Sequence, residues 1–298
     1  MYRTWVILTH TFFDAVVQPI YALLLIIAAV VMGVYQTLPF FTLGEDTLMF
    51  KAVSLDIIML VVLLLSLFAA SRSIYEEIED RTMLTLMSKP VARQQVLLGK
   101  FLGLLCAAAV AVAVLGVVLA ALVWMRVPED YNLPPNPIDE MVAERLVDTR
   151  AMHLAGLWPQ LVLLWMQVGV LIAISVTIST RFSLVVNLPA TIILYLVGNL
   201  TRFIEVAADA QGWVVRAVAY VVNTVLPFLA VFDLTQYTVY GTVALPGTPF
   251  AENPDAVSLP ALWLYVGAAG LYFMAYVAFV LLLGHWSLRT RELGGSEG

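Results

Sequence analysis

Long apolar runs recur along the chain, and they limit what it can fold into more than any other feature does. The hydrocarbon core of a bilayer is ~30 Å thick, so a helix that crosses it needs about 20 apolar residues. Backbone groups exposed to lipid must be paired within the segment itself, and runs without period-2 alternation achieve this as helices. The sequence therefore predicts an all-α membrane protein with six transmembrane helices. These spans are expected at about 18–37, 52–71, 101–124, 157–179, 184–204 and 261–284.

The overall composition supports a membrane protein and excludes several other classes. Hydrophobic residues make up 62% of the 298 residues, and charged residues only 12%. A soluble domain carries about 25% charged residues, so a soluble enzyme is excluded. The 15 basic and 21 acidic residues give a net charge of -6, which argues against binding to nucleic acid. The single cysteine, Cys106, can form no intrachain disulfide.

The first residues and the charge distribution predict an orientation. Residues 4–17 carry large apolar side chains loosely gathered on one helical face, which predicts a short interfacial helix leading into the first span. With the N-terminus in the cytoplasm, nine of the 15 basic residues fall on the cytoplasmic side. We therefore expect both termini in the cytoplasm and membrane lipid around the six spans.

Two segments between spans are long enough to carry structure of their own. After a proline-rich stretch, residues 138–150 place apolar residues at helical spacing, which predicts a small amphipathic helix on the outer surface. Residues 213–232 are mostly apolar but contain Pro227, and they either cross the membrane as a seventh span or dip into the outer leaflet. We expect the second arrangement, a partly re-entrant segment between spans five and six.

The segment 72–100, between spans two and three, is unusually charged and amphipathic. It holds nine of the chain's 36 formal charges, together with an apolar patch that includes Met83, Leu86 and Met87. Pro90 ends any helix that begins near Glu76. Two interpretations stay open: a solvated helix lying on the membrane, or a docking helix whose methionine-rich tip enters a groove on a cytoplasmic partner.

This segment resembles the cytoplasmic coupling region of ATP-binding-cassette (ABC) transporter permeases of the type-2 exporter class. Within that class it resembles the six-span group associated with multicopper enzyme maturation, copper processing and gliding motility. Arg81 stands where that group usually has glycine. The matching residues are Glu77, Glu79, Thr82, Leu84, Leu86, Ser88, Pro90, Arg93, Gly99 and Lys100, followed downstream by Leu226, Pro227, Phe232, Asp233 and the closing stretch 286–293.

The resemblance implies a permease subunit of an exporter in the bacterial inner membrane. Two copies, as a homodimer or a related heterodimer, would form the pathway, and separate cytoplasmic ATPase subunits would dock beneath them. The residues that it implies for coupling to the ATPase are Glu76, Glu77, Glu79, Arg81, Thr82, Met83, Leu86 and Met87.

The sequence itself agrees that any ATP is bound by another chain. Gly99-Lys100 is followed by Phe101 and lacks the preceding glycine of a phosphate-binding loop, so no cofactor and no catalytic residue are expected here. The three histidines, His10, His153 and His285, have no neighbours at metal-ligand spacing, so no metal site is expected.

Polar side chains inside the predicted spans are the candidates for a transport pathway. Such groups are costly in a membrane, so they either form hydrogen bonds between helices or line a pathway. Both interpretations stay open for Gln160, Gln167, Asn187 and Asn199.

Two functions from other classes compete with the permease. Glu76-Glu77-x-x-x-Arg81 also fits the motif of a family of intramembrane metalloproteases, in which Glu76 or Glu77 would activate a metal-bound water, but that family needs histidine ligands on later spans. A secondary transporter or a membrane scaffold would work without an ATPase. No inverted repeat, which would favour a secondary transporter, is evident in the sequence.

Overall fold

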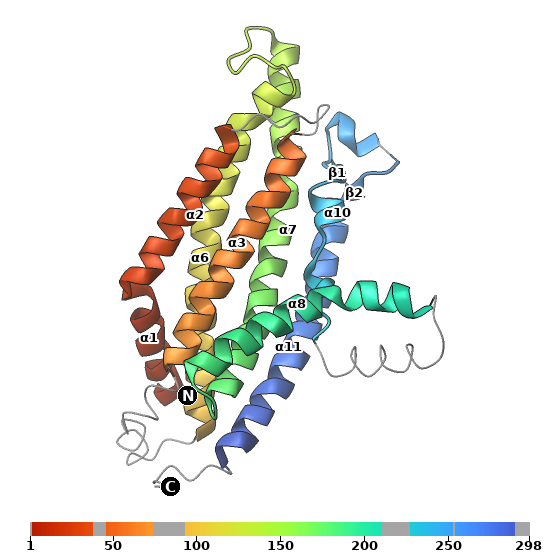
Figure 1. Ribbon diagram of the computed structural model, residues 1–298. Coiled ribbons are helices and arrows are strands. Elements are labelled where there is room, and N and C mark those ends of the chain that lie inside the picture. The colour runs from red at the N-terminus through yellow and green to blue at the C-terminus, as the bar shows by residue number, and fades with distance from the viewer. Residues whose placement is uncertain (1, 38–45, 74–92, 210–226, 253, 290–298) are drawn as a thin grey trace.

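The computed structural model describes residues 2–37, 46–73, 93–209, 227–252 and 254–289, and these fold almost entirely into helices (Figure 1). The long helices are α1 (Tyr2–Val17), α2 (Pro19–Thr37), α3 (Asp46–Ser71), α6 (Arg93–Asp130), α7 (Glu140–Ser179), α8 (Leu184–Asp209) and α11 (Leu259–Arg289). Between α8 and α11 lie η2 (Leu229–Phe232), α10 (Thr235–Thr238), β1 (Val243–Ala244), η3 (Pro249–Glu252) and β2 (Val257–Ser258). The two short strands pair in parallel, with Val243 opposite Val257.

Five of the described helices are long and apolar enough to cross a membrane: α2, α3, α6, α7 and α11. The fifth predicted span, 184–204, forms helix α8, but its apolar part is shorter and runs only over Val185–Leu200. In Figure 1, α8 is strongly inclined to the other long helices instead of running alongside them. The structure thus supports five long apolar spans and one shorter apolar helix, and a sixth full crossing stays a prediction.

The two ends of the bundle are distinguished by which chain segments meet there. The start of α1 and the end of α11 lie at the same end, and α3 and α7 also end there while α6 begins (Figure 1). We call this the termini end. At the opposite end, called the far end, α3, α7 and α11 begin and α6 ends. The charged segment 74–92, which joins α3 to α6, therefore starts and finishes at the termini end.

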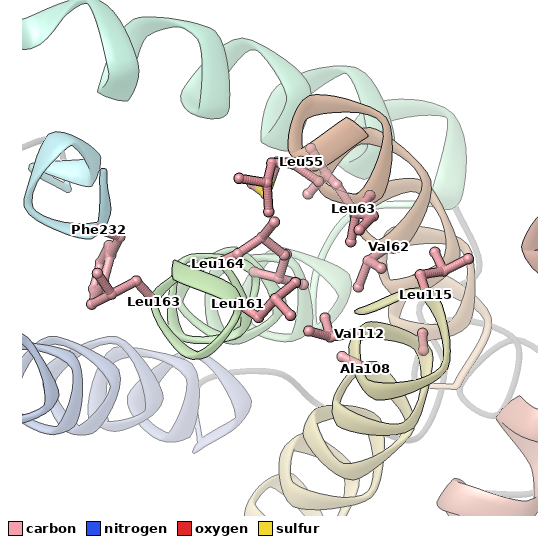
Figure 2. Close-up of a cluster of buried hydrophobic side chains, with 14 of the residues drawn as sticks. Leu55, Val62, Leu63, Ala108, Val112, Leu115, Leu161, Leu163, Leu164 and Phe232 are labelled. Atoms are coloured by element: carbon pink, nitrogen blue, oxygen red, sulfur yellow. The ribbon is translucent and has the colours of Figure 1, made fainter. Parts of the chain in front are cut away.

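Helix α7 forms the centre of the bundle and packs against α3, α6, α8 and α11. Leucines on its faces meet apolar side chains of α3 and α6, and Leu163 packs toward Phe232 of η2 (Figure 2). Lipid tails are as apolar as these side chains, so close packing between helices, not removal from water, stabilises such a core. The packing fixes the positions of the few polar groups that the core contains.

The far-end segment predicted as a separate amphipathic helix is instead continuous with the helix that forms the predicted span. The predicted helix at 138–150 and the predicted span at 157–179 form one continuous helix, α7. Asp139 caps its start by accepting a hydrogen bond from the backbone N–H of Met141 at 3.0 Å. No proline occurs between 140 and 158, and Pro159 is accommodated inside the helix, so nothing ends it before Ser179.

Two glycines permit close approach of neighbouring segments. A Cβ at Gly103 of α6 would lie 2.7 Å from the carbonyl oxygen of Leu8, so glycine lets α1 pack directly on α6. A Cβ at Gly156 of α7 would lie 2.5 Å from the carbonyl oxygen of Thr238, where α10 crosses α7. The predicted N-terminal helix at 4–17 is confirmed as α1, and its interfacial position stays a prediction.

Most of the predicted re-entrant segment 213–232 falls outside the described residues. Its last part, from Pro227, forms an irregular turn and η2, where Leu229 and Phe232 are fully buried. The backbone N–H of Phe228 donates to the hydroxyl of Tyr272 in α11 at 2.9 Å. Non-helical backbone is therefore held within protein here, but the path of the segment as a whole stays a prediction.

Candidate functional site

The eight residues predicted to couple the chain to an ATPase lie outside the described residues. The structure does describe the two points where their segment joins the bundle, Ser73 after α3 and Arg93 at the start of α6. The candidate site is therefore built from the side chains that hold these two points to the rest of the bundle.

Asn187, near the start of α8, is the centre of a buried polar cluster. Its amide nitrogen lies 2.6 Å from the hydroxyl of Ser71, the last residue of α3, and 2.8 Å from each of the hydroxyls of Ser175 and Ser179 in α7. All four side chains are fully buried. An amide has two N–H donors, so three acceptors share two hydrogens. One side chain thus joins three helices at the point where the predicted coupling segment begins.

Neighbouring hydroxyls complete the hydrogen bonding around Asn187. Thr191, one turn further along α8, donates to the backbone carbonyl of Asn187 at 2.9 Å and lies 3.2 Å from its amide oxygen. Ser179 donates to the carbonyl of Ser175 at 2.7 Å. Buried polar groups are costly unless they are paired, and here they are paired.

A buried lysine holds the other side of the same junction. Lys100 of α6 is 2% exposed, and its ammonium donates to the carbonyl of Ser73 and lies 3.3 Å from the Ser73 hydroxyl. Ser73 is the last described residue before the segment, and Lys100 lies two turns into the helix that follows it. The bond therefore ties the two ends of the segment to each other. We call Ser71, Ser73, Lys100, Ser175, Ser179 and Asn187 the termini-end cluster.

Helix α11 is tied to the same region by exposed and partly buried bonds. The guanidinium of Arg181, in the turn between α7 and α8, donates to the hydroxyl of Ser287 at 2.8 Å. The side chains of Gln94 and His285 meet at 3.1 Å, which links the start of α6 to the end of α11. Five helices, α3, α6, α7, α8 and α11, are thus connected by side-chain hydrogen bonds at this end.

The four predicted pathway residues all make hydrogen bonds within the protein. Asn187 belongs to the termini-end cluster. The amide of Gln167 in α7 donates to the side-chain oxygen of Asn199 in α8 at 3.1 Å. The side-chain oxygen of Gln160 accepts from the backbone N–H of Leu234, just before α10, at 3.1 Å. Each residue therefore joins α7 or α8 to a neighbour, and a role in lining a pathway stays a prediction.

The partners of Asn187 were not predicted from the sequence, although a signal for them was present. Ser175 and Ser179 are four residues apart, which places them on one face of a helix. Small hydroxyl residues on one face of a membrane helix are the expected partners for an asparagine on a neighbouring helix. Lys100 was identified only as part of the family motif, and Ser71 was not singled out, because their contacts depend on how the helices pack.

The far end also contains buried charged and polar groups. Arg126 of α6 donates to the carbonyl of Gln36, lies 3.9 Å from the carboxylate of Asp46, and stacks over the ring of Phe50. The hydroxyl of Tyr131 and the ring nitrogen Nε2 of His153 meet at 3.0 Å. Burial, together with the neighbouring Asp130 carboxylate, raises the pKa of Tyr131 above its usual value, so this hydroxyl stays protonated at neutral pH.

The positions of the histidines bear on the metalloprotease alternative. His153 lies at the far end and His285 at the termini end, where it meets Gln94. About 26 residues of α7 separate these levels, or roughly 40 Å at ~1.5 Å per residue, so the two cannot bind one metal ion. Within the described ranges, no three His, Cys, Asp or Glu side chains gather in a way that could hold a metal.

An apolar groove opens between α6, α7 and α11. It has a volume of about 520 Å³. The indole N–H of Trp165 donates to the carbonyl of Leu105 at 3.0 Å, so it is not available to a molecule in the groove. The surface that lines the groove is therefore almost entirely apolar. The groove is lined by Ala109, Val112, Ala113, Trp158, Leu161, Val162, Trp165 and Trp263.

Comparison with known proteins identifies the family. The sequence model of a family described as ABC-2 family transporter protein matches residues 7–183, which is more than half of the chain and runs from α1 to the end of α7. No curated protein matches the chain. The match says nothing of multicopper enzyme maturation or copper processing, so that narrower grouping stays a prediction. The chain belongs to the ABC-2 family of transporters and is a multi-pass membrane permease, the membrane component of an ABC transporter.

Proposed function

We propose that this permease is the membrane subunit of an ATP-driven exporter in the bacterial inner membrane. Its termini end faces the cytoplasm, and residues 74–92 dock on a separate ATPase subunit. A second copy, of the same or a related chain, completes the pathway. Family membership and the place of the segment between α3 and α6 support this proposal.

The anchoring of the segment is the observation that carries the proposal. On the α3 side, Ser71 is held by Asn187, and Ser73 is held by Lys100. Because the Asn187–Ser71 bond is buried and the Lys100–Ser73 bond is partly buried, a force applied to the segment would be transmitted to α3, α6, α7 and α8 together. A solvated helix that merely lies on the membrane would not need such anchors.

The Asn187 amide offers a way for the helices to shift without losing all their bonds. Its two N–H groups face three serine hydroxyls, so one hydroxyl is always available as an alternative acceptor. When ATP closes the ATPase dimer, α8 can move relative to α3 and α7 while the amide exchanges acceptors. Alternating access requires two such arrangements, each favoured by a different nucleotide state of the partner.

The same movement would open the contact between α7 and α8. The Gln167–Asn199 bond lies along this contact, and Gln160 lies further toward the far end. We propose that these side chains and Asn187 exchange their present partners for water or cargo in the opened state. The resemblance to the group associated with copper processing suggests a cargo linked to metalloenzyme assembly. The genes that flank this one would test that suggestion.

Co-purification with the ATPase subunit tests the proposal. We expect Met83→Glu combined with Met87→Glu to abolish recovery of the ATPase in mild detergent, because two charges replace the apolar tip of the docking helix. The matched control is Met141→Glu at the far end, where Met141 is 78% exposed. If the double variant and the control bring down equal amounts of ATPase, the docking role of residues 74–92 is wrong.

Coupling, as distinct from docking, needs a second measurement. We expect Asn187→Leu to retain the ATPase but to lose most of the permease's effect on ATP hydrolysis, because the helices no longer share one hub. Normal stimulation of hydrolysis by Asn187→Leu would leave docking intact and remove the termini-end cluster from the mechanism.

A further inference from the structure

A polar stripe runs along the first half of α3 at the far end. Thr47, Lys51 and Ser54 recur at intervals of four and three residues, which places them on one face of the helix. Their exposed fractions are 0%, 2% and 0%. His153 of α7 is 1% exposed, and α3 packs against α7, so the stripe lies in the interior of the bundle together with this histidine. We call these four residues the far-end stripe.

The far-end stripe is buried without the partners that buried polar groups normally have. The hydroxyls of Thr47 and Ser54 and the Nδ1 atom of His153 form no hydrogen bond. Within the described part of the chain, the Lys51 side chain forms neither an ion pair nor a hydrogen bond. Native proteins leave few such groups unpaired, and an unpaired one calls for an explanation in the function of the site.

The chemistry of the stripe is that of hydrogen-bond donors. The Lys51 ammonium can only donate, and the two hydroxyls can rotate to donate. The nearby carboxylates are engaged elsewhere: Asp46 lies 3.9 Å from Arg126, and Asp130 accepts the backbone N–H of Thr47 at 3.1 Å. His153 uses its other ring nitrogen with Tyr131. What the stripe lacks is therefore an anion.

We infer that the far-end stripe is a binding site for an anionic group of the cargo, a carboxylate or phosphate, and that this site is closed in the present conformation. Buried without partners, these groups disfavour the closed arrangement of α3 against α7. Opening this contact would return them to water and present the ammonium and hydroxyls to an anion. Side chains on a helix lean toward its N-terminus, which for α3 is the far end, so Lys51 is directed toward the exit. The inference rests on the proposed export function and adds the charge class of the cargo.

Charge-selective labelling of a cysteine tests the inference without knowledge of the cargo. In a Cys106→Ser background, Ser54→Cys is reconstituted with the ATPase and exposed from the far side to two membrane-impermeant methanethiosulfonates, one an anionic sulfonate and one a cationic trimethylammonium. Each rate is divided by the reagent's rate with a free thiol. We expect labelling in one of the two nucleotide states, ATP-free or ATP-trapped, with the anionic reagent preferred at least fivefold.

Matched variants separate the effect of Lys51 from that of access alone. Adding Lys51→Met to Ser54→Cys should keep the labelling and remove the preference for the anionic reagent. Ser66→Cys, a buried position twelve residues further along α3, should stay unlabelled in both states. If Ser54→Cys fails to assemble, Thr47→Cys provides the same measurement about two turns closer to the far end.

The outcomes distinguish failure of this inference from failure of the export function. If the complex hydrolyses ATP but the cysteine is never labelled, the stripe stays buried throughout the cycle and the inference is overturned. If both reagents react equally, the stripe does not select anions and the inference is overturned as well. If no ATPase accompanies the permease, the coupling proposal fails. If the permease without an ATPase is still labelled about fivefold faster by the anionic reagent than by the cationic one, the anion-binding site is supported independently.

Discussion

Two lysines, one at each end of the bundle, are buried to the same extent in opposite surroundings. Lys51 and Lys100 are each 2% exposed and lie in apolar helices. Lys100 donates to Ser73, two residues after the Ser71 hydroxyl that is bound by the Asn187 amide. Lys51 lies beside hydroxyls and an imidazole nitrogen that have no partner. Burial of a charge therefore does not by itself indicate its role, since the partners decide it.

The difference separates two uses of polar groups inside a membrane protein. In the termini-end cluster they are paired with one another and join the helices. In the far-end stripe the hydroxyls of Thr47 and Ser54 and the Nδ1 atom of His153 have no hydrogen-bond partner, and such groups call for an explanation in the function of the site. Under the proposed function, the termini end would receive movement from the ATPase and the far end would release cargo.

The largest expected effect on stability comes from replacing Asn187, the centre of the termini-end cluster. Asn187→Leu leaves three buried serine hydroxyls without their common donor, and unpaired buried groups cost about 1–3 kcal/mol each. We expect the free energy of unfolding to fall by about 3 kcal/mol, measured by titration of detergent micelles with a denaturing detergent. Asn199→Leu, which removes a single bond between side chains of α7 and α8, is the control and should cost clearly less.

The two lysines provide the most direct test of the comparison. Lys100→Met should lower the free energy of unfolding by about 1–3 kcal/mol, because it leaves the Ser73 carbonyl without its donor. Lys51→Met should leave stability unchanged or raise it by up to about 2 kcal/mol, because it removes a buried group that has no partner. Equal losses from both substitutions would show that Lys51 has a stabilising partner and would break the comparison.

A packing change at the far end should have a moderate effect. Gly156→Ala places a Cβ 2.5 Å from the carbonyl oxygen of Thr238, so α10 must move away from α7. Overpacking of this kind costs about 1–3 kcal/mol, and we expect the lower part of that range because α10 is short. Thermal unfolding in detergent measures the change. Gly267→Ala, where a Cβ would meet no atom within 4 Å, is the control and should leave the midpoint unchanged.

The smallest expected effect comes from the exposed rim of the termini end. Gln94→Ala removes a hydrogen bond to His285, but Gln94 is exposed, so water replaces the lost partner. The free energy of unfolding should change by no more than about 0.5 kcal/mol. A loss comparable to that of Lys100→Met would mean that the link between α6 and α11 is part of the buried cluster.

The apolar spans could be predicted from the sequence because the bilayer imposes a length on them. Helix α2 begins at Pro19 and ends at Thr37, almost as the apolar run 18–37 predicts. Length and composition do not decide the rest. The run at 184–204 is apolar enough to suggest a span, but the inclination of α8 depends on how it packs against α3 and α7, and a sixth crossing stays a prediction. Residues 138–150 were predicted as a separate surface helix because the polar residues of this stretch differ from the apolar run that follows, whereas α7 is continuous from Glu140.

The site was predictable only in part, because hydrogen bonds between helices depend on register. Asn187, Gln160, Gln167 and Asn199 could be identified as unusual from their polarity within apolar runs. Their partners could not, since Ser71 and Ser175 lie 116 and 12 residues from Asn187 in sequence. Lys51 was not singled out from the sequence, because nothing in the sequence shows that this side chain is buried inside the bundle.

The lengths of α6 and α7 have a consequence for how the protein meets its surroundings. At ~1.5 Å per residue, 38 and 40 residues give about 57 and 60 Å, against a hydrocarbon core of ~30 Å. These two antiparallel helices must therefore extend beyond the lipid as a stalk, whose tip at the far end is formed by residues 131–139 (Figure 1). Any soluble protein that receives cargo on that side would meet this rigid helical stalk before it reached the plane of the bilayer.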